Sequence, residues 1–283
     1  MSGTHAGRPV VAGIDDSAEA RRAAVWAASE ADRTGTSLRL VHAFETITYT
    51  ASGGFVPPPA YVEAVENAGR EMLEAARREA QAAHPQLAVE VDMCPGQPVA
   101  VLLDESQHAS MVVLGVKELS GVQRLTMFST AVSLAAHAQC PVAVIRSAVT
   151  GPASDGPVVV GVDGTPASEE AVRIAFEEAS ARRLDLVAVH AWTEFVSDRE
   201  FIYARQFALD LKAVHTREQE ILAERLAGWQ EKFPDVTVER VVSPEKPVKA
   251  LLDATAGAQL LVVGSRGRGG FTGMLLGSTS RKL

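Results

Sequence analysis

The stretch VVAGIDDSAEARRAAVWAASEADRTGTSLRLVHAF, which runs from Val10 to Phe44, predicts a buried strand, an amphipathic helix and a second strand. The same pattern returns without a gap as VVVGVDGTPASEEAVRIAFEEASARRLDLVAVHAW, from Val158 to Trp192. In both copies the first strand ends in Gly-x-Asp-x-Ser/Thr and the second ends in Val-His-Ala followed by an aromatic residue. A strand–helix–strand unit that occurs twice indicates two copies of one α/β domain.

A second pair of similar segments sets the length of the repeat. QPVAVLLDESQHASMVVLGV (Gln97 to Val116) matches KPVKALLDATAGAQLLVVGS (Lys246 to Ser265), so the period is about half of the 283 residues. That length suits two domains of ordinary size. We predict domains at 1–148 and 156–283, joined by SAVTGPASDGP (Ser147 to Pro157), which is rich in Gly, Pro and Ser.

Strands and helices alternate along the first copy. Strands that are apolar throughout are typical of parallel sheets covered by helices on both faces, so we predict a doubly wound α/β sheet in each domain. Such sheets bind ligands beyond the carboxyl ends of their strands. The expected strands are 9–15, 37–44, 88–94, 110–116 and 141–146, and the expected helices are 18–34, 60–83, 97–108 and 129–139.

The composition excludes several classes of protein. The formal charge of −8 would repel the phosphates of nucleic acid on average, although a local basic loop could still bind a small anion. Only two cysteines occur, and they form no CxxC pair or His/Cys cluster, so neither a disulfide framework nor a metal site is indicated. No apolar run approaches membrane-spanning length. We therefore expect a cytoplasmic protein.

The glycines near the end of the chain are the first candidate for chemistry. Gly264, Gly267 and Gly277 directly follow an apolar strand and precede Ser278. A glycine has no Cβ, so backbone N–H groups can approach an anion closely, and Ser278 can cap the helix that follows. The spacing is not a Walker A motif, and by itself it also fits an ordinary loop.

Acidic and histidine residues end the first two strands of each copy. Asp15 and Asp163 either complement the dipole of the next helix or accept hydrogen bonds from the hydroxyls of a ribose. His42 and His190 have no Ser, Cys or carboxylate placed to complete a catalytic triad or a metal site. We therefore expect a structural role for both histidines at the strand ends.

Taken together, GVDGT (Gly161 to Thr165), VHAW (Val189 to Trp192) and GSRG plus nine residues plus GS (Gly264 to Ser278) resemble the motifs of the universal stress protein family in its tandem form. The resemblance implies a sheet in the order 3-2-1-4-5, a cytoplasmic stress-response role, and ATP binding with weak or no hydrolysis. By this resemblance Asp163 would hold the ribose, the backbone at Ala191 would meet adenine, and the glycine loop would surround the phosphates. Arg266 and Arg268 either add charged contacts or are solvated loop residues. The implied nucleotide-binding residues of the second copy are Gly161, Val162, Asp163, Ala191, Gly264, Arg266, Gly267, Gly277, Ser278 and Thr279.

Each copy departs from the family pattern. The first keeps the counterparts Asp15, Gly115, Ser129 and Thr130, but has Glu118 and Phe128 in place of the second and third glycines. A carboxylate at that place would repel a phosphate, so we expect the first domain to be a structural or regulatory partner. The second copy ends soon after Thr279, and the repeat alignment predicts that it lacks the last helix and the fifth strand.

The functional prediction is a nucleotide-binding regulator that binds ATP, with or without Mg²⁺, mainly through the second domain. No catalytic residues are assigned, since no general base or nucleophile is visible near the glycine loop. Two alternatives stay open at this point: a slow ATPase or nucleotidyl-transfer enzyme, and an interaction module without a ligand. A homodimer and a regulatory protein partner also stay open.

Overall fold

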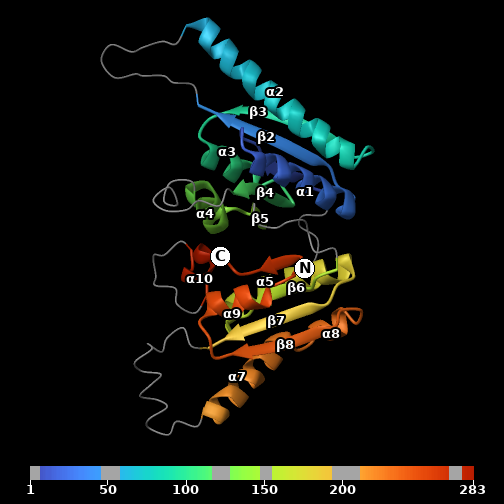
Figure 1. The fold of residues 1–283 in the computed structure, drawn as a ribbon, viewed down its shortest axis with the longest axis vertical. Helices are drawn as coiled ribbons and strands as arrows, with labels where there is room; N and C mark the ends of the chain where they lie inside the picture. The colour runs from blue at the N-terminus through green and yellow to red at the C-terminus, as the bar shows by residue number, and fades with distance from the viewer. Residues whose placement is uncertain (1–6, 46–57, 117–127, 147–154, 193–210, 268–275) are drawn as a thin grey trace, which may run out of the picture. The chain divides into compact units, whose positions relative to one another are not determined.

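The computed structural model describes residues 7–45, 58–116, 128–146, 155–192, 211–267 and 276–283. The chain divides into two compact units, Met1–Thr150 and Gly151–Leu283, each of which is an α/β layer structure (Figure 1). The described helices include none that is both long and apolar enough to cross a membrane.

The first unit contains a parallel five-stranded sheet in the order β3-β2-β1-β4-β5. Val10 of the central strand pairs with Leu38 on one side and Met111 on the other, so three apolar strands form the middle of the sheet. This order is the one that the sequence predicts. The strands are β1 (Val10–Gly13), β2 (Leu38–Phe44), β3 (Val89–Pro95), β4 (Met111–Val116) and β5 (Val142–Arg146).

Helices cover both faces of this sheet (Figure 1). α1 (Ala18–Thr34) and α2 (Pro59–Ala83) enclose one core, and α3 (Pro98–Glu105) and α4 (Phe128–His137) enclose the other. α1 lies close to the sheet because its inner side carries small side chains, all completely buried: Ala23, Ala24, Ala27, Ala28 and Ala31.

Two helices end earlier than the sequence predicts. α4 stops at His137 instead of residue 139. α3 stops at Glu105 instead of continuing to residue 108. The hydroxyl of the buried Ser106 donates to the carbonyl of Leu103 (2.7 Å) and accepts from the backbone N–H of Gln139 (3.1 Å). A serine that bonds to nearby backbone competes with helix continuation, which explains the early end.

The second unit repeats the first four strands of this plan. Its parallel sheet has the order β8-β7-β6-β9, and the described residues contain no fifth strand, as the repeat alignment predicts. Its strands are β6 (Val158–Gly161), β7 (Leu186–Ala191), β8 (Val238–Ser243) and β9 (Leu260–Val262). Its helices are α5 (Glu169–Arg182), α7 (Leu211–Leu226), α8 (Trp229–Lys232), α9 (Pro247–Ala254) and α10 (Ser278–Lys282), and a 3-10 turn, η2 (Pro166–Ser168), precedes α5.

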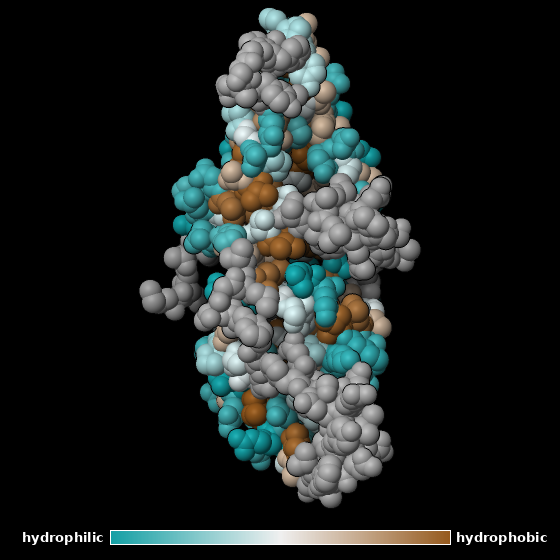
Figure 2. All heavy atoms as spheres, turned by 90° about the vertical axis from the view of Figure 1, so that its left-hand side faces the viewer, coloured by the Kyte–Doolittle hydropathy of each residue, from teal (hydrophilic) through white to brown (hydrophobic). Residues whose placement is uncertain are grey.

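Large apolar side chains are scarce on the described surface. On the face drawn in Figure 2, the hydrophobic residues outside the grey regions form small separate groups among hydrophilic ones. Tyr61, Val144 and Leu252 are the large hydrophobic side chains exposed within the described residues. Scattered residues of this kind are normal for a protein surface and do not mark a binding site.

Candidate functional site

A pocket of the second unit lies at the carboxyl ends of β6, β7 and β9. This is the end of a parallel sheet at which ligands are bound. One side of the pocket is the turn after β6 with Asp163, another is the loop after β9, and the first residues of α10 complete the wall. Apolar side chains form the remaining wall: Val189, Ala191, Trp192, Pro247, Leu251 and Val263.

Asp163 is the one carboxylate among the described residues of this pocket. Its Oδ1 accepts two hydrogen bonds from Thr165, one from the backbone N–H and one from the hydroxyl, both at 2.8 Å. Its Oδ2 is buried and has no hydrogen-bond partner among the described residues. A buried polar atom without a partner is costly, so this oxygen is suited to accept a hydrogen bond from a ligand.

The second glycine of the loop lies directly over that oxygen. A Cβ added to Gly267 would be 3.1 Å from Asp163 Oδ2, so any side chain there would press on the carboxylate. The loop is tied to α10, because the N–H of Gly277 donates to the carbonyl of Ser265 (2.8 Å) and the hydroxyl of Ser280 donates to the same carbonyl (3.0 Å). The glycines thus bring the backbone close to Asp163 and to the start of α10.

The ten residues that the sequence analysis assigns to the second unit all line this one pocket. Arg266 is exposed at its rim, and Arg268 lies outside the described residues. Sequence reasoning missed other lining residues: Ser168, Val189, Trp192, Pro247, Leu251, Val263 and Ser280. Two of these residues could have been found from the sequence. Trp192 is the aromatic residue after the Val-His-Ala motif, and Leu251 belongs to the second pair of matching segments.

The corresponding place in the first unit differs. Asp15 is exposed, and its Oδ1 accepts from the backbone N–H of Ser17 (3.0 Å) and from its hydroxyl (2.5 Å). A Cβ on Gly115 would lie 2.2 Å from the carbonyl carbon and oxygen of Glu19, so this glycine is required for packing of β4 against α1. A ligand contact by Gly115 stays a prediction, but its close packing already accounts for a glycine.

The remaining predicted residues of the first unit are only partly described. Thr130 lies half-buried in the first turn of α4, and Phe128 and Ser129 open that helix. Glu118 lies outside the described residues. The role of Ser129 and Thr130 in binding therefore stays a prediction.

The two histidines take equivalent structural positions. Nδ1 of His42 donates to the carbonyl of Ile14 (2.8 Å), and Nδ1 of His190 donates to the carbonyl of Val162 (2.7 Å). Each bond joins the second strand of a unit to the end of its first strand. This geometry agrees with the structural role expected for both residues. The expectation that no carboxylate lies beside them is wrong for His190, because Glu218 Oε2 lies 2.8 Å from its Nε2.

Comparisons with known proteins identify the family. A sequence model of the universal stress protein family matches residues 7–146 and again residues 156–283. The chain belongs to the universal stress protein family. Universal stress protein Rv2005c of Mycobacterium tuberculosis (strain ATCC 25618 / H37Rv) is 42% identical over 280 residues, covering 96% of this chain and 91% of the relative. Universal stress protein Rv2623 of the same strain is 38% identical over 286 residues, covering 98% and 93%.

A solved structure of the family shares the fold. The universal stress protein from Archaeoglobus fulgidus DSM 4304 matches with a TM-score of 0.66 at 18% identity, over 97% of this chain and 93% of that chain. The tandem universal stress protein fold, which the sequence motifs predict, is confirmed.

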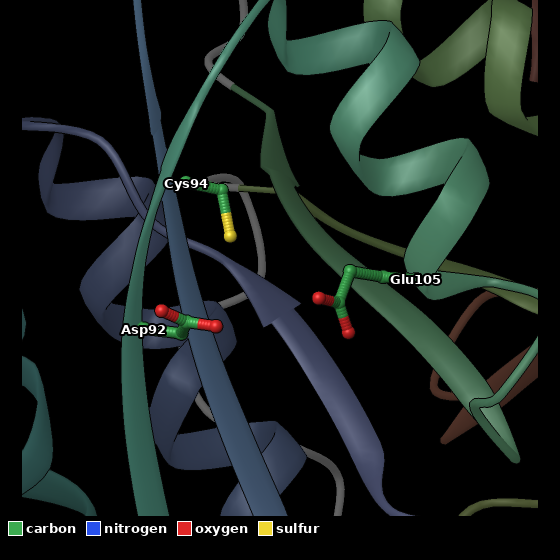
Figure 3. A group of neighbouring side chains, drawn as sticks. All are labelled: Asp92, Cys94 and Glu105. Atoms are coloured by element: carbon green, nitrogen blue, oxygen red, sulfur yellow. The ribbon is translucent and has the colours of Figure 1, made fainter.

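One side-chain cluster of the first universal stress protein unit has the composition of a metal site. Asp92 and Cys94 extend from β3 and Glu105 from the end of α3, and the three side chains point toward one another (Figure 3). Arg39 already pairs with both carboxylates, at 2.5 Å from Asp92 Oδ2 and 3.1 Å from Glu105 Oε2. Burial, together with the nearby Asp92 and Glu105, raises the pKa of the Cys94 thiol to about 11. A metal needs deprotonated ligands, so a protonated thiol beside neutralised carboxylates makes a poor site.

The second unit has no such charged network at the equivalent positions. The repeat alignment places Val187, Val241, Ser243 and Ala254 at the positions of Arg39, Asp92, Cys94 and Glu105. Three of these, Val187, Val241 and Ala254, belong to the apolar core between the sheet and α9. The network is therefore a feature of the first unit alone.

Proposed function

We propose that this universal stress protein is a cytoplasmic stress-response regulator that binds ATP in its second unit, with little or no hydrolysis. The observation that carries this proposal is Asp163 Oδ2, which is buried beneath Gly267 and has no partner among the described residues. A ribose hydroxyl is a neutral donor, and its hydrogen bond to a carboxylate would be charge-assisted.

The rest of the pocket fits the other parts of a nucleotide. The apolar wall that includes Ala191, Leu251 and Val263 suits the faces of an adenine ring. The glycine loop presents backbone that phosphate oxygens can approach closely, and Arg266 at the rim could pair with their charge. Adenine, ribose and phosphate would then contact three different sides of one pocket.

Mg²⁺ belongs to the proposal only as a companion of the phosphates. The described pocket residues include a single carboxylate, and the one group of three metal-type ligands found among the described residues lies in the first unit, beside Arg39. Mg²⁺ is commonly held by one or two carboxylates together with substrate phosphates. The protein itself would therefore supply few ligands to such an ion.

The experiment that tests the proposal is a calorimetric titration of the full chain with ATP. We expect one molecule of ATP per chain, and Asp163→Ala should weaken binding by about tenfold to hundredfold, the effect of losing a hydrogen bond to a charged group. Asp15→Ala is the matched control in the first unit and should leave the affinity unchanged. Binding that survives Asp163→Ala but is lost with Asp15→Ala would overturn the assignment.

Further assays of the same purified protein distinguish the alternative functions. Release of phosphate from ATP above the background rate would favour the slow ATPase, and transfer of a nucleotidyl group would favour the transferase. No heat of binding, and no nucleotide in mass spectra of molecules released from the purified protein, would favour the interaction module. Light scattering tests the homodimer, and the charge of −8 argues against nucleic acid as a partner.

A further inference from the structure

α7 of the second unit is far from Asp163 in the sequence, but its side chains hold the backbone on both sides of Asp163. Nε of Arg225, in the last turn of α7, donates to the carbonyl of Gly164 at 3.0 Å. Gly164 has a φ of +76°, in the region that favours glycine, and it lies between Asp163 and the threonine that fixes its Oδ1. The Arg225 bond therefore anchors the turn that carries the carboxylate.

A second connection reaches the other side of Asp163 through a buried histidine. Nε2 of His190 lies 2.8 Å from Glu218 Oε2, and Nδ1 of the same ring donates to the carbonyl of Val162 at 2.7 Å. His190 is completely buried. Since a carbonyl can only accept, Nδ1 carries a proton, and the Nε2–Oε2 contact requires one further proton between those two atoms. Glu218 thereby fixes the ring that holds Val162.

Both connections start from one face of α7. Glu218 and Arg225 are seven residues apart, which is close to two turns of an α-helix, so their side chains leave the helix in nearly the same direction. Glu218 acts on the carbonyl of Val162 through His190, and Arg225 donates directly to the carbonyl of Gly164. Val162 and Gly164 are the residues before and after Asp163. We call these two connections the α7 clamp.

The first unit lacks the residues of this clamp. When Leu73 of α2 is aligned with Leu222 of α7, both of which are buried, Gly69 and Ala76 stand at the positions of Glu218 and Arg225. Gly69 fits against the ring of His42, with its missing Cβ 3.0 Å from Cδ2. In that unit the equivalent carboxylate, Asp15, is exposed. The clamp and the aspartate with a buried, unpartnered oxygen therefore occur in the same unit.

We propose that Arg225 and Glu218 are positioning residues, which hold the Asp163 carboxylate in the orientation that accepts the ribose hydroxyls. The inference rests on the proposed ATP site. Holding an acceptor in place before binding lowers the ordering cost of the complex. Two anchors, on the carbonyl before Asp163 and on the carbonyl of the residue after it, leave Asp163 little freedom. The clamp thus acts on ribose recognition and not on the adenine or phosphate contacts.

The test compares ATP with 2′,3′-dideoxy-ATP, which lacks both ribose hydroxyls, in calorimetric titrations of the full chain. The unaltered protein should prefer ATP by about tenfold or more, and Asp163→Ala should remove that preference. Arg225→Met, which keeps the length of the side chain without a donor, should lower the preference to about threefold or less while leaving dideoxy-ATP binding within about twofold. Arg217→Met, an exposed arginine on the same helix, is the control and should keep the full preference.

The possible results distinguish a positioning role of the α7 clamp from a general loss of nucleotide affinity and from absence of the proposed ATP site. Equal losses of affinity for ATP and dideoxy-ATP in Arg225→Met, or an unchanged preference, would overturn the clamp while the ATP site stands. No binding of ATP by the unaltered protein would overturn both. If Arg225→Met does not fold, as circular dichroism would show, Glu218→Ala replaces it, and the same reduction in preference is required.

Discussion

Gly115 lies near the end of β4 and Gly264 just after β9, and they occupy the same position in the repeat, yet they meet different surroundings. A Cβ on Gly115 would lie 2.2 Å from the backbone of Glu19, whereas a Cβ on Gly264 would lie 3.8 Å from the carbonyl of Ala167, the counterpart of Glu19. The difference follows from how the first helix begins. Glycines at the same position of the repeat can therefore have different roles. Gly115 allows two backbone segments to pack closely, and Gly264 lines a pocket.

The local sequence explains the two helix starts. In the first unit α1 begins at Ala18, directly after Ser17, whose side chain accepts from the N–H of Ala20. In the second unit Pro166 opens a 3-10 turn, and α5 begins only at Glu169. The proline fixes its own φ and lacks a donor, which suits the first position of such a turn. The later start leaves room between the end of β9 and the helix.

The largest expected effect comes from copying the first unit into the second. Gly267→Glu introduces the residue that the first unit has at position 118, directly over Asp163. A carboxylate at about 4 Å from a phosphate oxygen costs roughly 4 kcal/mol at an effective dielectric of about 20, which weakens ATP binding by about three orders of magnitude. Calorimetric titration measures the loss. Gly267→Gln has the same shape without the charge, and equal losses in both variants would show that size and not charge decides.

The next effect distinguishes the packing glycine from the pocket glycine. Gly115→Ala should destabilise the first unit by about 3 kcal/mol, because its Cβ would meet backbone that cannot move aside easily. Gly264→Ala should cost about 1 kcal/mol or less, since its nearest contact is the carbonyl of Arg266 at 3.1 Å. Urea unfolding gives the totals, and hydrogen exchange shows which unit is affected. Equal costs in the two units would contradict the difference described above.

The smallest effect concerns the thiols, which occur only in the first unit. Burial is the main cause that raises the pKa of both Cys94 and Cys140 to about 11, above the ordinary value of 9.0. Between pH 9 and 11 the unfolded chain therefore releases protons that the folded unit retains, so the free energy of unfolding falls as pH rises. Because both thiols are partly exposed, their joint contribution is about 1 kcal/mol.

A double variant isolates this contribution. Cys94→Ala with Cys140→Ala should show a smaller decline in the free energy of unfolding over that pH interval than the unaltered chain, since all other titrating groups are common to both. Slow reaction of the native thiols with iodoacetamide at pH 8 gives an independent measure of the raised pKa. Parallel pH profiles of the two proteins would contradict the assigned shifts.

Sequence reasoning reached the fold and much of the pocket because those features repeat as local patterns. The apolar strands and the Gly-x-Asp-x-Ser/Thr motif place Asp163 at a strand end, and the strand order and most element bounds agree with the structure. The packing role of Gly115 could not be read, because glycine spacing does not reveal whether the missing Cβ faces a ligand or backbone. Arg225 also gave no signal, because its partner lies 61 residues away and is a backbone carbonyl, which any residue provides.

The charged network around Arg39 has a consequence for how a duplicated chain reaches its native state. Two similar domains on one chain can exchange strands during folding. If β3 paired with β7, Val187 would stand in place of Arg39, and Asp92 would lose its arginine. If β8 paired with β2, Val241 would stand in place of Asp92, although Glu239 would still pair with Arg39 as Glu90 does in the native sheet. A partly exposed charge that loses its partner costs about 1 kcal/mol or less. The network thus favours pairing of β3 with β2 of its own unit over pairing with β7 of the other unit.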